Sequence, residues 1–387
     1  MPPWPRAAPH CVAAYARRVR EHVLVLNAGS STLKASVLAV GSEDAEASVT
    51  VPMRGVGDAP DALRRASQAI IAAGVEMSAI GAVGHRVVHG GSLFTRTTLI
   101  DDAVLERIRE LAWLAPLHNP VAAEVIAAAR AALPAVPHAA AFDSAFHATL
   151  PTEAYVYAVP YEWYTDWGYR RYGFHGLSVA WSVERAGALL GRDEVGVVVA
   201  HLGAGCSVSA IWRGRSVSTS MGMTPLEGLV MGTRAGSVDP GVLLAAQRDH
   251  GLDPRALEDV LEHRSGLLAL SGRTADMREL LTLAPTDERA ALAISVFERS
   301  AAGAIAAAAT ALPRLDAVVF TGGIGENAAS VRAGIVRRLA AIGVPPVDDE
   351  AVDTDRALVA RPIAVLVVFA REDAVIAREL AALTAGR

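Results

Sequence analysis

Three short segments of the chain have residue types that could bind phosphate groups: residues 27–32, 201–207 and 322–327. Each combines glycine with hydroxyl or amide side chains, and each follows a run of apolar residues. Turns of this kind expose backbone N–H groups with no bulky side chain in the way, which suits a phosphate. Lys34 adds a positive charge just after the first segment. An ordinary polar hairpin explains any one segment equally well, but their recurrence predicts two similar lobes that close on one polyphosphate.

Arg86 and Asp143 each stand at or just beyond the end of an apolar, strand-like run. A buried arginine is costly unless it meets an anion or a carboxylate. A salt bridge to a core aspartate and a clamp on an anionic substrate both explain Arg86. Asp143 is either an acid of an active site or the N-cap of a helix.

Two further groups favour anion chemistry. Arg234 is the one conspicuous cation in residues 218–241, a glycine-rich stretch too long for a plain turn. Long ordered loops in compact domains are usually functional. His175 stands near the expected start of a helix that runs to Leu190, a position that favours an anion. The acid pair Glu372 and Asp373 is either a metal-ligand pair or favourable charge at a helix N-terminus.

The elements that must position these groups follow from hydrophobic periodicity and from cap and turn residues. Strands are expected at residues 23–26, 33–40, 80–89, 139–142, 195–200, 208–212, 317–321 and 363–369. Further helices are expected at residues 61–73, 101–111, 121–133 and 374–383, and from an N-cap at Thr286 to Leu312. The aromatic-rich residues 155–172 predict a packed interface near a lobe boundary.

Length and composition exclude several classes of protein. At 387 residues, 52% of them hydrophobic and 20% charged, the chain is expected to form two ordinary domains. A net charge of −5 gives no general attraction to nucleic acid or to an anionic membrane. The apolar runs are too short to span a bilayer. With only Cys11 and Cys206, neither a disulfide framework nor a cysteine zinc site is expected.

Two common nucleotide-binding patterns fit poorly. A Walker A sequence is absent, which argues against a P-loop fold. Residues 323–328 match a relaxed dinucleotide fingerprint, but that motif usually opens the first unit of its domain. A Rossmann oxidoreductase is therefore a minority alternative.

Six motifs in order closely resemble the acetate kinase family of short-chain carboxylate kinases. They are NAGSSTLK (27–34), GHRVVHGG (84–91), FDSAFH (142–147), RYGFHG (171–176), the loop 218–241 and FTGGIGEN (320–327). The resemblance runs from about His22 to the C-terminus. It implies the actin-like ATPase fold, an α/β architecture of two ribonuclease-H-like lobes with a nucleotide cleft between them.

The resemblance also implies partners and boundaries. It implies an ATP:acetate phosphotransferase that uses ATP and Mg²⁺, or Mn²⁺, to convert acetate reversibly to acetyl phosphate and ADP. A cytoplasmic homodimer without nucleic-acid or membrane partners is expected. We expect residues 1–21 to be a disordered extension, residues 22–157 with 374–387 to form the N-terminal lobe, and residues 158–373 to form the nucleotide-binding lobe.

Residue roles carry over by motif position. Asp143, His175 and Arg234 match the catalytic positions, and Asn27 and Glu372 the metal positions. The acid-binding positions correspond to Arg86, Val88, Leu117, His118, Phe174 and Pro225. By the same resemblance, Ser30, Thr32 and Lys34 would lie by the phosphates. The positions that hold the nucleotide correspond to His201, Leu202, Gly203, Ala204, Gly205, Asp276, Met277, Arg278, Gly323, Ile324, Gly325, Glu326 and Asn327.

Physical reasoning refines three of these roles. Acetate is already ionised near pH 7, so Asp143 need not act as a general base and is expected to orient Arg86 or Arg234, or to tune the surroundings of the metal. The family usually has asparagine where this chain has Ala204, and Thr-Asn-Glu-Glu where it has Ala370 to Asp373. The first departure removes an amide near the phosphates. The second makes Asn27 the better-supported metal residue.

Two alternatives to acetate kinase stay open. A propionate or butyrate kinase would use the same scaffold, because one methylene is worth only about 1–3 kcal/mol of discrimination. Val88 favours a small acid. A non-enzymatic ATP-binding regulator is the other alternative, although Arg86 and Arg234 argue against it because a nucleotide switch needs no carboxylate clamp.

Overall fold

The computed structural model describes residues 22–29 and 31–385, which divide into two compact units. Unit 1 comprises the described residues up to Ala145 together with those from Arg371 onward, and unit 2 comprises Phe146–Ala370. These boundaries fall earlier in the chain than residues 157 and 373, where the sequence placed them. The expected extension, residues 1–21, and Ser30 lie outside the described residues.

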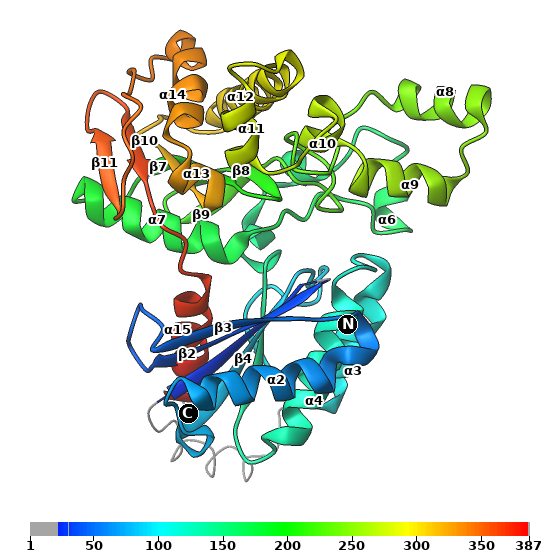
Figure 1. Ribbon diagram of the computed structural model, residues 1–387, viewed down its shortest axis with the longest axis vertical. Coiled ribbons are helices and arrows are strands. Elements are labelled where there is room, and N and C mark those ends of the chain that lie inside the picture. The colour runs from blue at the N-terminus through cyan, green and yellow to red at the C-terminus, as the bar shows by residue number, and fades with distance from the viewer. Residues whose placement is uncertain (1–21, 30, 386–387) are drawn as a thin grey trace. The chain divides into compact units, whose positions relative to one another are not determined.

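Unit 1 is a mixed six-stranded sheet with helices on both faces (Figure 1). Its strands, in spatial order, are β3 (Ala47–Pro52), β2 (Thr32–Ala39), β1 (His22–Ala28), β4 (Ile80–Val87), β6 (His138–Phe142) and β5 (Thr98–Leu99). Its helices are α2 (Ala59–Ala72), α3 (Asp102–Glu110), α4 (Asn119–Ala132) and α15 (Glu372–Ala385), with short 3₁₀ turns at Val56–Asp58, Met77–Ala79 and Leu111–Trp113.

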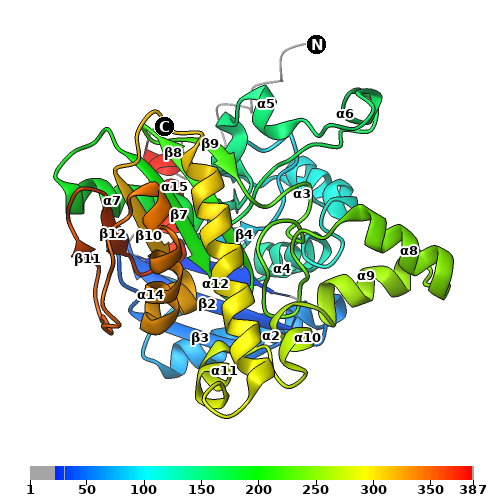
Figure 2. The same cartoon turned by 90° about the horizontal axis from the view of Figure 1, so that it is seen from above.

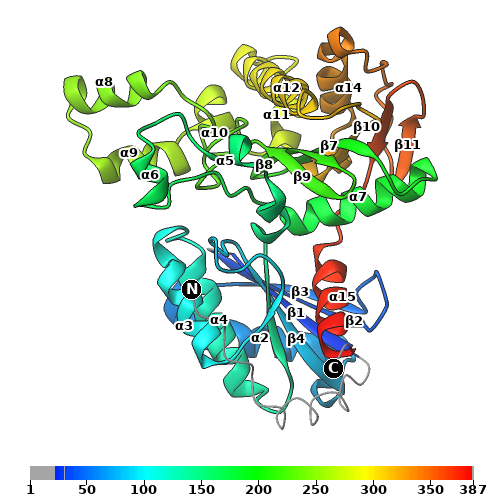
Figure 3. The same cartoon turned by 180° about the vertical axis from the view of Figure 1, so that it is seen from behind.

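The alternation of side chains along β4 shows which helices cover which face. Val83 packs into the apolar cluster that Leu63 of α2 and Val125 of α4 help to form. A Cβ on the next residue, Gly84, would lie 2.4 Å from a methyl group of Ile376 on α15. Successive strand residues point to opposite faces. Helices α2 and α4 therefore cover one face and α15 the other, and Gly84 lets α15 approach the strand closely (Figure 3).

Unit 2 holds a second six-stranded sheet. In spatial order its strands are β11 (Arg356–Val359), β12 (Ala364–Val367), β10 (Ala317–Thr321), β7 (Gly196–Leu202), β8 (Cys206–Trp212) and β9 (Arg215–Thr219). The helices are α5 (Thr152–Tyr155), α6 (Glu162–Thr165), α7 (Gly176–Leu190), α8 (Pro240–His250), α9 (Pro254–His263), α10 (Gly266–Ser271), α11 (Met277–Leu283), α12 (Glu288–Ala309), α13 (Gly322–Asn327) and α14 (Ala329–Arg338). Short 3₁₀ turns span Ala145–Thr149 and Ala340–Ile342.

The two sheets share one topology. In each, three antiparallel strands in sequence (β1–β3, β7–β9) are followed by two strands parallel to the first (β4 and β6, β10 and β12). In each, the last of these also pairs with a short antiparallel edge strand. The prediction of two similar α/β lobes is confirmed.

Helix α12 lies across β7 and β8 in Figure 2. Within the part of the chain that the structure describes, α12 is the one helix long and apolar enough to cross a membrane. Its side chains Phe297, Ala301 and Ile305 are buried in unit 2, as in the core helix of a globular domain.

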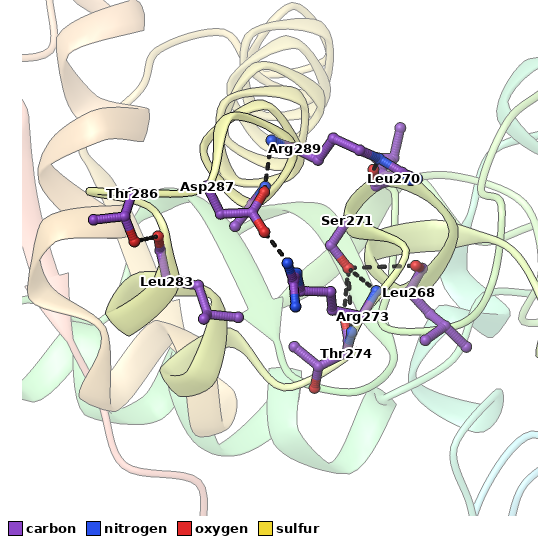
Figure 4. A network of polar contacts seen from close by, with 10 residues as sticks. Leu268, Leu270, Ser271, Arg273, Thr274, Leu283, Thr286, Asp287 and Arg289 are labelled. Atoms are coloured by element: carbon purple, nitrogen blue, oxygen red, sulfur yellow. Dashed lines mark hydrogen bonds and ion pairs between the residues drawn. The ribbon is translucent and has the colours of Figure 1, made fainter.

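Two local predictions were wrong. Asp287, not Thr286, caps α12: its Oδ1 accepts from the backbone N–H groups of Arg289 and Ala290, whereas the Thr286 hydroxyl donates back to the Leu283 carbonyl (Figure 4). A carboxylate can accept two of the four orphan N–H groups at a helix start, and Asp287 also binds Arg273. Residues 322–327, expected as a turn, form the short helix α13.

Candidate active-site residues

In unit 1, four polar residues meet where β1, β4 and β6 end, and we call Asn27, Arg86, Asp143 and Glu372 the Arg86 cluster. Asn27 and Arg86 are direct neighbours in the parallel β1–β4 register, and Asp143 follows β6. Because these strands are parallel, their carboxyl ends lie at one edge of the sheet, the usual place for a ligand in α/β proteins. The sheet topology therefore brings together three residues that lie far apart in sequence.

The guanidinium of Arg86 is held by a bidentate ion pair. Its Nε and Nη2 donate to the two carboxylate oxygens of Asp143, at 2.9 and 2.5 Å, and its Nη1 donates to Oδ1 of Asn27 at 3.0 Å. Asp143 is 1% exposed. Both explanations of Arg86 from the sequence required an anionic partner, and the structure shows the aspartate. Both carboxylate oxygens of Asp143 bind Arg86.

The positive charge of Arg86 lies close to the carboxylates of Asp143 and Glu372. Burial by itself would lower the pKa of Arg86, but the carboxylates of Asp143 and Glu372 outweigh burial and raise it. Oε2 of Glu372 lies 3.7 Å from Nε of Arg86. Burial raises the pKa of Glu372, Arg86 opposes that shift, and the negative charge of Asp143 adds to it. Arg86 therefore stays charged at every physiological pH.

Lys34 and Asp373 form an ion pair beside this cluster. Nζ of Lys34 lies 2.8 Å from Oδ2 of Asp373, and the side chain of Lys34 is 44% exposed. Glu372 and Asp373 are the first residues of α15, so they also place negative charge at a helix N-terminus. Both explanations of this acid pair thus remain compatible with its position.

The oxygen donors of Asn27 and Glu372 fit a hard divalent cation. Both contact Arg86, and both present oxygen atoms, the ligands that Mg²⁺ prefers. Among residues 22–29 and 31–385, no group of three or more His, Cys, Asp or Glu side chains could hold a metal ion. Mg²⁺ is usually bound by one or two carboxylates together with substrate phosphates, so a sparse protein ligand set fits it.

Three residues of unit 1 were expected to bind the acid: Val88 follows β4, and Leu117 and His118 precede α4. Val88 is 9% exposed, whereas Leu117 is 42% exposed and His118 is half-buried before α4. Asn119, which the sequence analysis did not single out, is buried and hydrogen-bonds both backbone groups of His89. The only sequence feature that pointed to Asn119 was its place directly after Leu117 and His118.

In unit 2, a second group of residues meets after β7, and we call His175, His201, Gly205 and Arg234 the His175 cluster. The rings of His175 and His201 stack with centroids 4.1 Å apart. Nδ1 of His175 shares a hydrogen bond of 3.0 Å with the hydroxyl of Ser207. His175 has φ of 58°, a left-handed conformation that is rare outside glycine and occurs here directly before α7. Strained backbone of this kind concentrates at functional sites.

Arg234 is held from α9. Its Nε donates to Oε2 of Glu262 at 2.9 Å, and Glu262 is largely buried. A Cβ on Gly205 would lie 3.4 Å from Nη1 of Arg234 and 3.5 Å from Nε2 of His175. Bare backbone at Gly205 therefore leaves space between two groups that can carry positive charge. The sequence offered no signal that Glu262 would position Arg234.

The glycine-rich segments of unit 2 pack backbone against backbone. A Cβ on Gly322, whose φ is 76°, would lie 2.8 Å from the Leu202 carbonyl and 3.1 Å from Nε2 of His201. Gly203 lies beside the backbone of Gly323, and its N–H donates to the Gly205 carbonyl at 3.1 Å. Any side chain at Gly322 would push the two segments apart. Ala204 is exposed, and its carbonyl accepts from Gly232 at 3.2 Å.

Glu326 and Arg332 hold α13 at its two ends. Oε1 of Glu326 accepts from the N–H groups of Gly322 and Ala370, both at 2.9 Å. Arg332, 1% exposed, donates to the carbonyls of Gly325 and Glu326. The sequence analysis missed Arg332. Gly325 is buried, Gly323 and Asn327 are exposed and Ile324 is half-buried.

Asp276 is the N-cap of α11, whose first two residues are Met277 and Arg278. Oδ1 of Asp276 accepts from the Arg278 backbone, and its Oδ2 pairs with the exposed guanidinium of Arg278. These hydrogen bonds from Arg278, the side-chain one foremost, lower the pKa of Asp276 to about 2. Met277 is buried, so it contributes to the core. The remaining acid-binding positions of unit 2 are Phe174, which is buried, and Pro225, whose carbonyl lies 3.5 Å from Nη1 of Arg234.

A model of the Acetokinase family matches residues 50–378. The chain belongs to the acetokinase family. It is 44% identical over 395 residues to the acetate kinase of Deinococcus radiodurans, an alignment that covers 94% of this chain and 98% of that protein. This family assignment agrees with the resemblance carried by the six motifs.

Solved structures of the family have the same architecture. A propionate kinase from Francisella tularensis superposes with a TM-score of 0.85 at 35% identity, covering 93% of this chain and 99% of that one. The acetate kinase of Porphyromonas gingivalis gives a TM-score of 0.85 at 31% identity, covering 95% of this chain and 100% of that one. This member of the acetokinase family has the two-lobed actin-like ATPase fold.

Proposed function

We propose that this acetokinase transfers a phosphoryl group reversibly between ATP and acetate, giving acetyl phosphate and ADP. The observation that carries the proposal is the bidentate pair of Arg86 and Asp143, which leaves a permanently charged guanidinium beside the Val88 turn. A short acid needs a positive group for its carboxylate and a small apolar surface for its methyl group. Both belong to the same strand end.

Positioning and positive charge supply the catalysis. Phosphoryl transfer spreads charge over the equatorial oxygens, so its transition state is stabilised by fixed cations and hydrogen-bond donors. Arg86, Arg234 and His175 are the groups of this chain that carry that role. Arg234 is oriented by Glu262, and His175 by Ser207.

Asp143 is a positioning residue in this mechanism. Acetate has a pKa near ~4 and is already an anion near neutral pH, so its attack on phosphorus requires no base. Asp143 uses both carboxylate oxygens to fix the plane of the Arg86 guanidinium.

Nucleotide binding falls to the glycine-rich segments of unit 2. Residues 201–205 and 323–327 present backbone groups, and residues 276–278 lie at the start of α11. Glu326 would contribute to nucleotide binding by holding the backbone in place, because its carboxylate accepts from the N–H groups of Gly322 and Ala370. Lys34 of unit 1 adds positive charge for the phosphates.

Asn27 and Glu372 would hold Mg²⁺, or Mn²⁺. The bound ion would neutralise phosphate charge during transfer. Asn27 contacts Arg86 directly, so the metal residue and the acid-binding residue share one hydrogen-bonded network.

Propionate is the competing substrate. The family includes propionate kinases, one of which superposes on this chain with a TM-score of 0.85. A single methylene changes binding in an apolar pocket by only about 1–3 kcal/mol. Val88 favours acetate because its branched side chain leaves less room than a smaller residue would.

The decisive assay traps acyl phosphate with hydroxylamine in the presence of ATP and Mg²⁺. Acetate, propionate and butyrate are compared in the wild type and in Arg234→Ala. Acetate-preferring turnover that the substitution abolishes is the expected result. Preference for a longer acid would leave the kinase assignment intact and refute the acetate preference; no turnover with any acid would refute the proposed function.

We also propose that the protein is a cytoplasmic homodimer, which the resemblance to the family implies. Helices α8 and α9 bury none of their residues, and Val242 and Leu244 of α8 are 57% and 61% exposed. A second copy of the chain would cover this apolar surface. Light scattering of the wild type and of Val242→Ser with Leu244→Ser tests the assignment, with a dimer expected for the first and a weakened dimer for the second.

A further inference from the structure

Asn119 joins two segments that are distant in sequence. The residue is fully buried at the first position of α4. Its Oδ1 accepts from the backbone N–H of His89 at 3.2 Å, and its Nδ2 donates to the His89 carbonyl at 2.9 Å. One side chain thus satisfies both backbone groups of the residue that follows Val88.

The rest of the turn is held by other groups of unit 1. The N–H of Gly90 donates to the hydroxyl of Ser144 at 2.9 Å, and that of Gly91 donates to Nδ1 of His89 at 2.9 Å. On the other side of Val88, the Val87 carbonyl accepts from Asp143 at 3.0 Å. Val88 therefore lies between two anchored backbone positions, and Asn119 is the anchor that comes from α4.

The backbone of Asn119 is itself fixed. Its N–H donates to the Ala115 carbonyl at 2.9 Å, and the N–H of His118 donates to the same carbonyl. This closes a turn that contains Leu117 and His118. Asn119 thus ties the Val88 turn to the segment that carries two other acid-binding positions.

We propose that Asn119 is a positioning residue that sets the length of acid this enzyme accepts. The inference rests on the proposed function. The side chain of a valine is stiff at χ1, so its place follows its backbone. When Asn119 holds the backbone after Val88, the apolar surface at Val88 cannot retreat to admit a longer acid.

The side chain at this position must be an amide to do both tasks. An amide of this length offers one acceptor and donor hydrogens together. Aspartate would retain the acceptor for the His89 N–H but place an oxygen against the His89 carbonyl. Serine is too short to reach both groups. Either substitution removes at least one of the two hydrogen bonds to His89 and so loosens the turn on the α4 side, while leaving Arg86 and Asp143 unchanged.

The test compares Asn119→Ser and Asn119→Asp with the wild type in steady-state assays of acetate, propionate and ATP. We expect the KM for acetate to rise about tenfold and the propionate-to-acetate ratio of kcat/KM to rise several-fold, which is below the roughly 10–200-fold that one methylene can control. The KM for ATP should change by less than about twofold.

Ile126→Val is the matched control, because Ile126 is fully buried on the same helix and has no part in the hydrogen bonds that hold His89. It should lower Tm and leave the acid ratio unchanged. Ser144→Ala frees only the Gly90 N–H, so it should shift the propionate-to-acetate ratio of kcat/KM in the same direction by a smaller factor. If neither Asn119 variant folds, this variant tests the inference.

An unchanged acid ratio in variants whose Tm falls like that of Ile126→Val would overturn the inference and leave Asn119 a structural residue. That outcome would leave the proposed function standing. Failure of the wild type to phosphorylate any acid would instead refute the proposed function, and the inference with it.

Discussion

Asp143 accepts two parallel hydrogen bonds from Arg86, and this pair links the strand β4 to the chain that leaves β6. The geometry is the fork that guanidinium and carboxylate groups form best. Because Asn27 binds the third nitrogen, the orientation of Arg86 is determined by residues from three chain segments.

Replacing Asp143 with asparagine should lower kcat by on the order of 10²-fold. An amide retains one acceptor, so the guanidinium loses its bidentate partner and its fixed plane. The pH profile of kcat from pH 5 to 9 should keep its shape, because no base is removed. A rate loss that follows the titration of a single base would contradict the positioning role of Asp143. Arg86→Lys is the companion variant, since lysine retains the charge without the fork.

Restoring the amide at position 204 tests the main departure from the family. Ala204→Asn should lower the KM for ATP by roughly 2–10-fold, the factor that one hydrogen bond of about 0.5–1.5 kcal/mol gives. Residue 204 is exposed, so the added side chain needs no repacking. Ala204→Leu is the control for added bulk. Equal ATP constants in the wild type and the asparagine variant would show that backbone contacts alone hold the phosphates.

Removing the Glu326 carboxylate should weaken nucleotide binding through the backbone. Glu326→Ala frees the N–H groups of Gly322 and Ala370, which loosens the start of α13. We expect the KM for ATP to rise several-fold and the Ala370 amide to exchange its hydrogen faster. Glu326→Gln retains an acceptor oxygen and should behave nearly like the wild type. Slow exchange at Ala370 in the alanine variant would contradict this role.

Two core histidines predict an acid-sensitive unit 1. Nε2 of His85 and Nδ1 of His138 lie 3.0 Å apart in a buried pair. Burial, then His138 and Arg130, hold the pKa of His85 well below 6.5, and burial lowers that of His138. The unfolded chain binds protons that the folded chain does not, so stability should fall as the pH drops below about 6.5. The slope that His85 contributes is up to about 1.4 kcal/mol per pH unit, and His138 adds to it in the same direction.

Urea unfolding between pH 5 and 8 measures this dependence. His85→Leu should flatten the slope of the unfolding free energy against pH below 6.5, and carboxylates elsewhere contribute equally to both proteins. Equal slopes in the wild type and the variant would contradict the assignment to this pair.

The sequence by itself determined the type of lobe and most of its strands. Runs of β-branched residues bounded by glycine turns marked β1, β2, β7 and β10 closely, because local hydrophobic pattern and turn chemistry act over a few residues. The six motifs also identified the family, since their residues must keep particular types wherever they lie in space.

Only the tertiary structure decided which groups meet. That Asp143 partners Arg86, that Glu262 holds Arg234, and that Asn119 anchors the turn after Val88 all depend on contacts between residues 28 or more positions apart. Such contacts are set by sheet register and helix packing, which local pattern does not encode. For the same reason Glu326, expected to face the nucleotide, is engaged by backbone from the far end of unit 2.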